Sequence, residues 1–94
     1  MPDVLPLPRL SPVRHGQLLD YDELHREAVK AVEASGRARA EIAEALGVTP
    51  PAVTRALKAP GARYAGLQAR IIEEVTGYRI EDRSRVEFRV VRKN

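Results

Sequence analysis

Apolar side chains recur with a helical period through the middle of the chain, which predicts a series of short helices. The first apolar stripe has the spacing i, i+4, i+7 and i+8, which places its members on one face of a helix. Its members are Leu24, Ala28, Ala31 and Val32. Carboxylates at Asp20 and Asp22 precede the stripe, and Ser35-Gly36 follows it with a C-terminal glycine signal. We therefore expect a first helix between about residues 20 and 35.

Two shorter helices follow, separated by a tight turn. The segment Ala38–Leu46 predicts a second helix, which Gly47 ends. Thr49 can cap a third helix, and Pro50 then occupies the first helical position, where its missing N–H costs nothing. The third helix runs to about Lys58. The residues expected to be buried in these two helices are Ile42, Ala43, Leu46, Val53, Ala56 and Leu57.

A fourth helix is predicted over Ala65–Thr76, and the period then changes to that of a strand. Gly77 ends the helix, after which apolar and charged residues alternate through Tyr78–Glu81 and again through Val86–Val91. The buried positions expected in the fourth helix are Leu67, Ile71, Ile72 and Val75. The two alternating segments predict one strand or a hairpin that turns at Arg83–Arg85.

Residues 1–19 contain four prolines, so they cannot form a continuous helix. We expect an extended N-terminal arm over residues 1–19, a helical domain over residues 20–77 and a strand tail over residues 78–94. The predicted fold class is mainly α, with four helices, an extended arm and a short C-terminal β-strand or hairpin.

The composition limits the size of the core and the chemistry available to it. A chain of 94 residues with one Phe, three Tyr and no Trp forms one domain, whose core must consist mainly of small aliphatic side chains. The absence of cysteine excludes disulfides, cysteine-ligated zinc and thiol catalysis. No apolar run approaches the roughly 18 residues that a membrane span needs, and the N-terminus is unlike a signal peptide. We therefore expect a cytoplasmic protein without a membrane partner.

Signals for catalysis are missing. His15 and His25 have no acidic partners at ligand spacing, so we expect no metal site, and a local contact between His25 and Asp22 is the simpler interpretation. The serines do not occur in a nucleophile-elbow context, and there is no phosphate-binding loop or dinucleotide fingerprint. The chain is accordingly expected not to be an enzyme and to need no cofactor.

Positive charge is concentrated in two blocks. The net charge is +3, whereas residues 37–70 alone hold six basic and two acidic groups, and residues 78–94 hold six basic and three acidic groups. Thirteen of the sixteen basic residues are arginine, whose planar fork suits phosphate and guanine. This distribution favours a polyanionic partner. A GC-rich genome, which raises the arginine and alanine content together, is the alternative explanation.

The segment Arg39–Lys58 has the residues that two helices crossing over a three-residue turn require. Ala43 is small where the next helix passes over it, and Gly47 stands where the backbone needs a left-handed conformation. Apolar residues that seal the corner are Ile42, Leu46, Val48 and Val53. With the helices on either side, over about Asp22–Thr76, this pattern resembles the helix-turn-helix of the lambda-repressor-like family, including Cro-type and XRE-type regulators.

The resemblance implies that the second helix lies across the DNA backbone and the third enters the major groove. Residues that it places against DNA are Arg39, Thr49, Pro50, Pro51, Thr54, Arg55, Lys58, Arg63 and Tyr64. Among them, Arg55 is expected to recognise a base, while Thr49 and Lys58 hold phosphates. Alternative interpretations make Arg55 a solvated helix residue, Tyr64 a core aromatic, and Arg63 and Arg70 partners of Glu73 or Glu74. The Pro50-Pro51 pair departs from the family, because many relatives have polar residues there.

The C-terminal strand resembles the strands that Cro-type proteins use to dimerise. Pairing across a two-fold axis would bury Val86, Phe88 and Val90 and set two recognition helices about 34 Å apart, one turn of DNA. The alternative is an intrachain hairpin packed on the chain's own helices.

The function expected from these observations is sequence-specific binding of double-stranded DNA by a dimeric bacterial or phage transcriptional regulator. One rival is a protein-interaction module of the antitoxin type, whose arm or tail binds a partner protein. RNA binding is a second rival, which the scarcity of aromatic residues disfavours.

Overall fold

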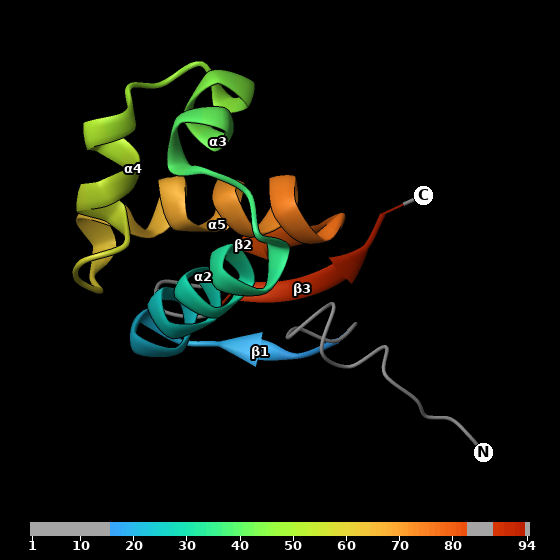
Figure 1. Cartoon of the computed structure of the whole chain (residues 1–94). Coiled ribbons are helices and arrows are strands. Elements are labelled where there is room, and N and C mark those ends of the chain that lie inside the picture. Colours follow the sequence, from blue (N-terminus) through green and yellow to red (C-terminus); the bar gives the residue numbers. More distant parts are fainter. Residues whose placement is uncertain (1–15, 83–87, 94) are drawn as a thin grey trace.

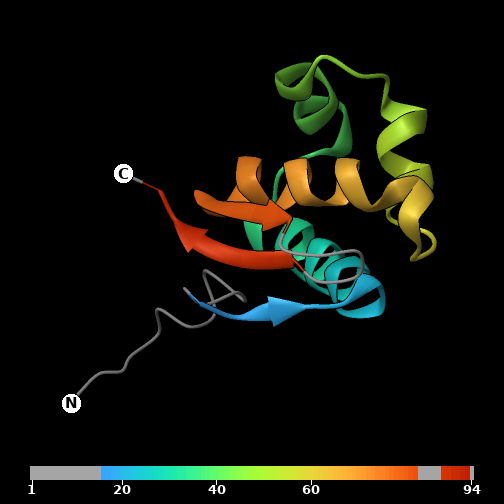
Figure 2. The ribbon, with the colours of Figure 1, turned by 180° about the vertical axis from the view of Figure 1, so that it is seen from behind.

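The computed structural model describes residues 16–82 and 88–93. Its helices are α2 (Tyr21–Ser35), α3 (Arg39–Leu46), α4 (Pro50–Ala56) and α5 (Ala62–Thr76). Its strands are β1 (Leu18–Leu19), β2 (Tyr78–Asp82) and β3 (Phe88–Arg92). The three strands form one antiparallel sheet with β3 in the middle (Figures 1 and 2). The predicted class, mainly helical with C-terminal strands, is confirmed.

The helices begin and end close to the residues that the sequence indicates. Asp20 caps α2 by accepting a hydrogen bond of 2.8 Å from the N–H of Glu23, whose carboxylate accepts one of 3.0 Å from the N–H of Asp20. This capping box satisfies two amides at the start of the helix. The largest difference concerns α5, which begins at Ala62, three residues before the predicted start.

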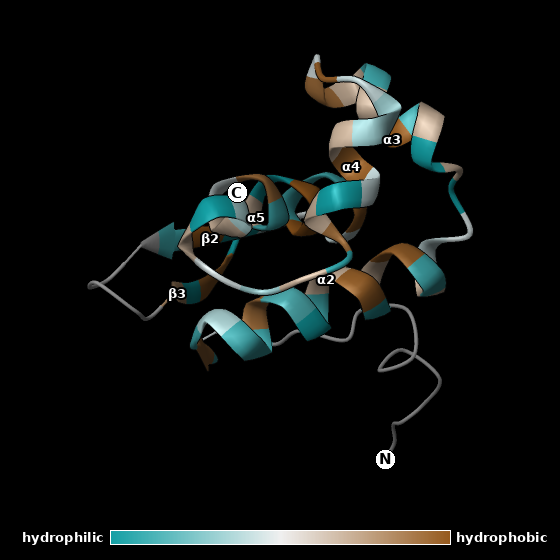
Figure 3. Cartoon of the chain, turned by 90° about the vertical axis from the view of Figure 1, so that its left-hand side faces the viewer, coloured by the Kyte–Doolittle hydropathy of each residue, from teal (hydrophilic) through white to brown (hydrophobic). Residues whose placement is uncertain are grey.

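The core lies where α2, α5 and the inner face of the sheet meet, and α3 and α4 cover the other side of α5 (Figure 1). The predicted apolar stripes supply this core. Fully buried members from the four helices are Leu24, Ala28, Ile42, Val53, Ala56, Ile71 and Ile72, all with an exposed fraction of 0%. Hydrophobic and hydrophilic positions share each helix in Figure 3, as expected for amphipathic helices around a common core.

The sheet adds its own apolar face to this core, which corrects the predicted dimer contact. Phe88 and Val90 have exposed fractions of only 7% and 0% within the single chain, and the Phe88 ring lies 5.9 Å from that of Tyr21. The prediction that they pair across a two-fold axis is therefore wrong. The intrachain alternative holds, because β3 pairs with β2 and buries this face against the helices. Val86 and the predicted turn at Arg83–Arg85 lie outside the described residues.

Both edges of β3 are paired within the chain, so this strand has no open edge for a second copy. Residues 18 and 19, assigned to the N-terminal arm, form β1 beside it, and Val90 exchanges hydrogen bonds with Gly16 and Gln17 on that side. On the outer edge of the sheet, the N–H of Ile80 donates to the carboxylate of Glu73 at 2.9 Å. The Glu73 carboxylate thus binds a backbone N–H that could otherwise pair with another strand.

Candidate nucleic-acid interface

The turn between α3 and α4 has the geometry that its sequence predicts. Gly47 has a φ of 73°, in the left-handed region, so the chain can leave α3 and turn back at once. The N–H of Val48 then donates to the carbonyl of Ala43 at 3.0 Å. Thr49 caps α4, because its hydroxyl oxygen accepts a hydrogen bond of 3.3 Å from the N–H of Ala52. The two helices are therefore joined by only three residues, 47–49.

Apolar contacts seal this corner. Ala43 has an exposed fraction of 1%, and Ile42 and Val53 are fully buried. Leu46 and Val48 are half-buried and pack against the same core. The four apolar positions and the one small position expected in the corner thus all face the core or lie against it.

Three polar side chains of α2 and α5 hold α3 and α4 in place by hydrogen bonds to backbone carbonyls at or near the C-terminal ends of these two helices. Gln68 of α5 is fully buried and donates to the carbonyls of Ala56 and Ala59 at 2.8 and 2.9 Å. Arg70 of α5 donates to the carbonyl of Leu46 at 2.6 Å. The carbonyls of Ala56 and Leu46 belong to the last residues of α4 and α3, where a helix leaves its acceptors without internal donors, and Ala59 lies in the loop after α4. The contacts fix the position of both helices on α5.

His25 of α2 is the third of these side chains. Its Nε2 lies 2.9 Å from the carbonyl of Leu57, at the end of α4. The expected local contact with Asp22 is wrong, because the ring reaches across to another helix. Gln68 was not anticipated either, although a polar residue within the apolar stripe of α5 is a signal of a buried hydrogen-bonding role.

The basic residues of the segment 37–70 separate into two groups. Arg37 pairs with Glu74 at 3.1 Å, and Arg70 binds the end of α3, so both are engaged within the chain. The remaining four are exposed and have no carboxylate partner among the described residues. They are Arg39, Arg55, Lys58 and Arg63. The alternative that Arg63 and Arg70 pair with Glu73 or Glu74 is wrong. The Glu74 carboxylate binds Arg37, and that of Glu73 accepts from the N–H of Ile80.

The start of α3 and the exposed side of α4 lie next to each other. The guanidinium of Arg39 lies 3.5 Å from the hydroxyl of Thr54, fifteen residues along the chain. Pro51 and Arg55 have the spacing i and i+4, so they share one face of α4, and Lys58 lies in the turn just after the helix. We call these three residues, with Thr49, Pro50 and Thr54, the α4 surface. All six of its side chains are exposed or half-exposed.

The first turn of α5 contributes the last two predicted residues. Arg63 is exposed, with its guanidinium carbon 5.7 Å from the centre of the Tyr64 ring. Tyr64 is half-buried and packs against the hydrophobic core. The alternative role of Tyr64 as a core aromatic is therefore the one for which the structure provides contacts.

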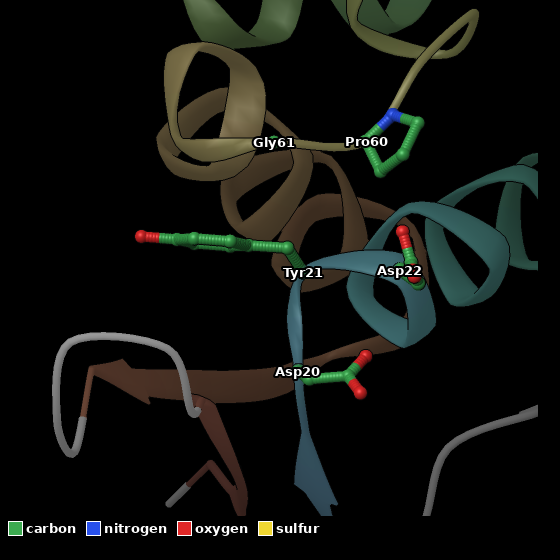
Figure 4. A pocket seen from close by; sticks show the side chains of 5 residues that line it. All are labelled: Asp20, Tyr21, Asp22, Pro60 and Gly61. Atoms are coloured by element: carbon green, nitrogen blue, oxygen red, sulfur yellow. The ribbon is translucent and has the colours of Figure 1, made fainter.

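An open cavity of about 380 Å³ lies beside this region and differs from it in charge. Its lining, shown in Figure 4, consists of Asp20, Tyr21, Asp22, Pro60 and Gly61. Asp20 already caps α2, and the two carboxylates make the cavity unsuited to a phosphate. The cavity is therefore separate from the candidate interface.

The described residues contain no group of three or more side chains able to hold a metal ion. None of the helices in these ranges combines the length and the apolarity that crossing a membrane requires. No family model, curated protein or solved structure matches the chain significantly.

Proposed function

We propose that this chain is a sequence-specific binder of double-stranded DNA, with a helix-turn-helix of the lambda-repressor-like type formed by α3 and α4. In this proposal α3 lies across the phosphate backbone and α4 enters the major groove. Arg55 hydrogen-bonds to a base, and Arg39, Lys58 and Arg63 bind phosphates.

The observation that carries the proposal is the contact between Arg39 and Thr54. It brings a cation from the start of α3 to Thr54 of α4. Arg55 follows Thr54 in the sequence, and Arg39, Arg55 and Lys58 have no carboxylate partner in the described part of the chain. Cations left unpaired on one surface cost free energy through mutual repulsion, and a polyanion relieves that cost. The anchoring of both helices by α5 supports the same function, because base recognition needs a rigid element.

A homodimer is part of the proposal, through a surface other than the buried face of β3. The outward face of the sheet carries Leu18, which is 46% exposed and is the one large hydrophobic residue that is exposed in the described ranges. Arg89 of β3 is its neighbour in the register. Sedimentation of the free chain at micromolar concentration checks this part. A chain that is monomeric both free and on its best DNA site would refute it.

The test of the proposed function is a selection of bound fragments from random duplex DNA, followed by fluorescence anisotropy on the enriched site. We expect binding to the enriched site to be at least about 10³-fold tighter than to random DNA. The same sequence as single-stranded RNA is the control. Equal affinity for all duplexes would reduce the proposal to nonspecific binding, and no affinity for any duplex would refute it.

A further inference from the structure

The α4 surface contains two exposed prolines where hydrogen-bonding side chains would be useful for base recognition. Pro50 and Pro51 form the first turn of α4, and both are exposed. Pro50 has a structural explanation, since proline suits the first position of a helix. Pro51 costs no helical hydrogen bond either, since the N–H groups of the first turn have no internal acceptor, and its ring is exposed on the same face as Arg55.

The backbone of this turn has no free donor either. Residues 50 and 51 are prolines and lack an N–H. The N–H of Ala52 donates to Thr49, to its carbonyl at 3.0 Å and its hydroxyl oxygen at 3.3 Å, and that of Val53 donates to the Thr49 carbonyl at 3.3 Å. The first turn of α4 therefore has no free N–H group, and its two exposed side chains are hydrocarbon rings. The hydrogen-bonding side chains lie further along: Thr54 and Arg55 in the helix and Lys58 in the turn after it.

Duplex DNA presents one apolar group at the base edges of its major groove, the C5-methyl group of thymine. The other groups there are hydrogen-bond donors and acceptors, which lose water without compensation against a hydrocarbon surface. A proline ring has no side-chain rotamer freedom to lose on binding, so an apolar contact to it costs little entropy.

We propose that the Pro51 ring, with Pro50 beside it, recognises the C5-methyl group of thymine in each half-site. This inference rests on the proposed function and makes it more specific. Hydrogen bonds from Arg55 then select one base pair, and apolar contact with the two prolines selects a thymine a few base pairs away. The cations around them supply the charge complementarity that holds α4 in the groove.

The experiment replaces each thymine of the enriched site, one at a time, by deoxyuridine, which lacks only the methyl group. Fluorescence anisotropy at fixed salt gives the affinity for each duplex. We expect the affinity to fall about fourfold at one or two thymines per half-site and to stay unchanged at the others. A change of about fourfold is the value for burial of one methyl-sized group. Specific binding that is unaffected by every uracil replacement would overturn the inference and leave the proposed function intact.

Two variants test whether Pro51 makes the contact. Pro51→Ser keeps a residue compatible with the first helical turn and should remove the difference between thymine and uracil at the sensitive position. Pro60→Ser is the matched control, since Pro60 is an exposed proline outside the α4 surface, and it should keep the fourfold difference. Circular dichroism verifies that both variants fold. A Pro51→Ser chain that still distinguishes thymine from uracil would overturn the assignment.

Discussion

The two basic regions of this chain have similar charges in the sequence but differ in the structure. Around α3 and α4, Arg39, Arg55, Lys58 and Arg63 have no carboxylate partner among the described residues. In the sheet, Arg79 pairs with Glu81 at 3.0 Å, and Lys93 donates to the carbonyl of Glu73 at 3.4 Å. The net charge of a segment is therefore a poor guide to how much of that charge a ligand can use.

The difference follows from the geometry of helices and strands. In β2 the residues i and i+2 point to the same side, so the sequence Arg-Ile-Glu places Arg79 and Glu81 side by side. In α4 the residue that shares a face with Arg55 is Pro51, and the helix contains no acidic residue. Arg55 thus has no carboxylate neighbour within its helix, whereas Arg79 of the sheet is neutralised within the chain.

The largest expected effect is the dependence of DNA binding on salt. Arg39, Arg55, Lys58 and Arg63 of both copies of a dimer should make about 6–10 phosphate contacts, and each contact releases counterions from the DNA. Affinity should then fall on the order of 10³–10⁵-fold between 50 and 200 mM salt. Anisotropy titrations over that range measure the slope. A nearly salt-independent complex would show that these cations do not contact phosphate.

The next largest effect is a difference in stability between variants of two adjacent valines, which lie on opposite faces of β3. Val90 is fully buried, whereas Val91 is half-buried on the other face. We expect Val90→Asp to lower the free energy of unfolding by more than about 4 kcal/mol, because it buries an unpaired charge. Val91→Asp should cost about 1 kcal/mol or less. Urea denaturation followed by circular dichroism measures both. Equal costs would mean that the sheet does not pack on the helices as described.

The helices could be predicted well because their signals are local. Capping residues, Gly47 and the apolar stripes each act within a few residues, and they place the four helices within three residues of their observed starts. The corner residues of the candidate site follow from the same local rules. Its exposed cations could be named from sequence because a helix face is defined by its spacing alone.

The contacts that were missed join residues far apart in the chain. Residue 19 pairs with residue 88 in the sheet, and His25 reaches the carbonyl of Leu57. No period or spacing encodes such pairs. The burial of Phe88 is another example, since alternation shows that it shares a face with Val90 but not which surface covers that face.

A smaller effect distinguishes base recognition from phosphate binding within the corner. Arg55→Ala should cost about 1–3 kcal/mol of binding on the enriched site and little on random DNA. Lys58→Ala should weaken binding to both by similar factors, because a phosphate contact is independent of sequence. Fluorescence anisotropy gives the affinity of each variant for the enriched site and for random DNA. If Arg55→Ala lowers both affinities equally, Arg55 is a phosphate contact and the base is recognised elsewhere.

The smallest effect is expected in the sheet and completes the comparison of the two basic regions. Arg79 is paired with Glu81, and about half of its side chain is exposed (52%), so the pair contributes little to stability, about 0.5 kcal/mol. Its charge is already neutralised, and it belongs to β2, which packs on α5 and not on α4. Figure 1 shows the two elements apart. We therefore expect Arg79→Ala to leave the salt slope of DNA binding unchanged, whereas Lys58→Ala should reduce it by about one for each chain bound. The two variants remove one positive charge each, so a general effect of net charge would change both slopes alike. An equal reduction by Arg79→Ala would show that the sheet also binds the duplex.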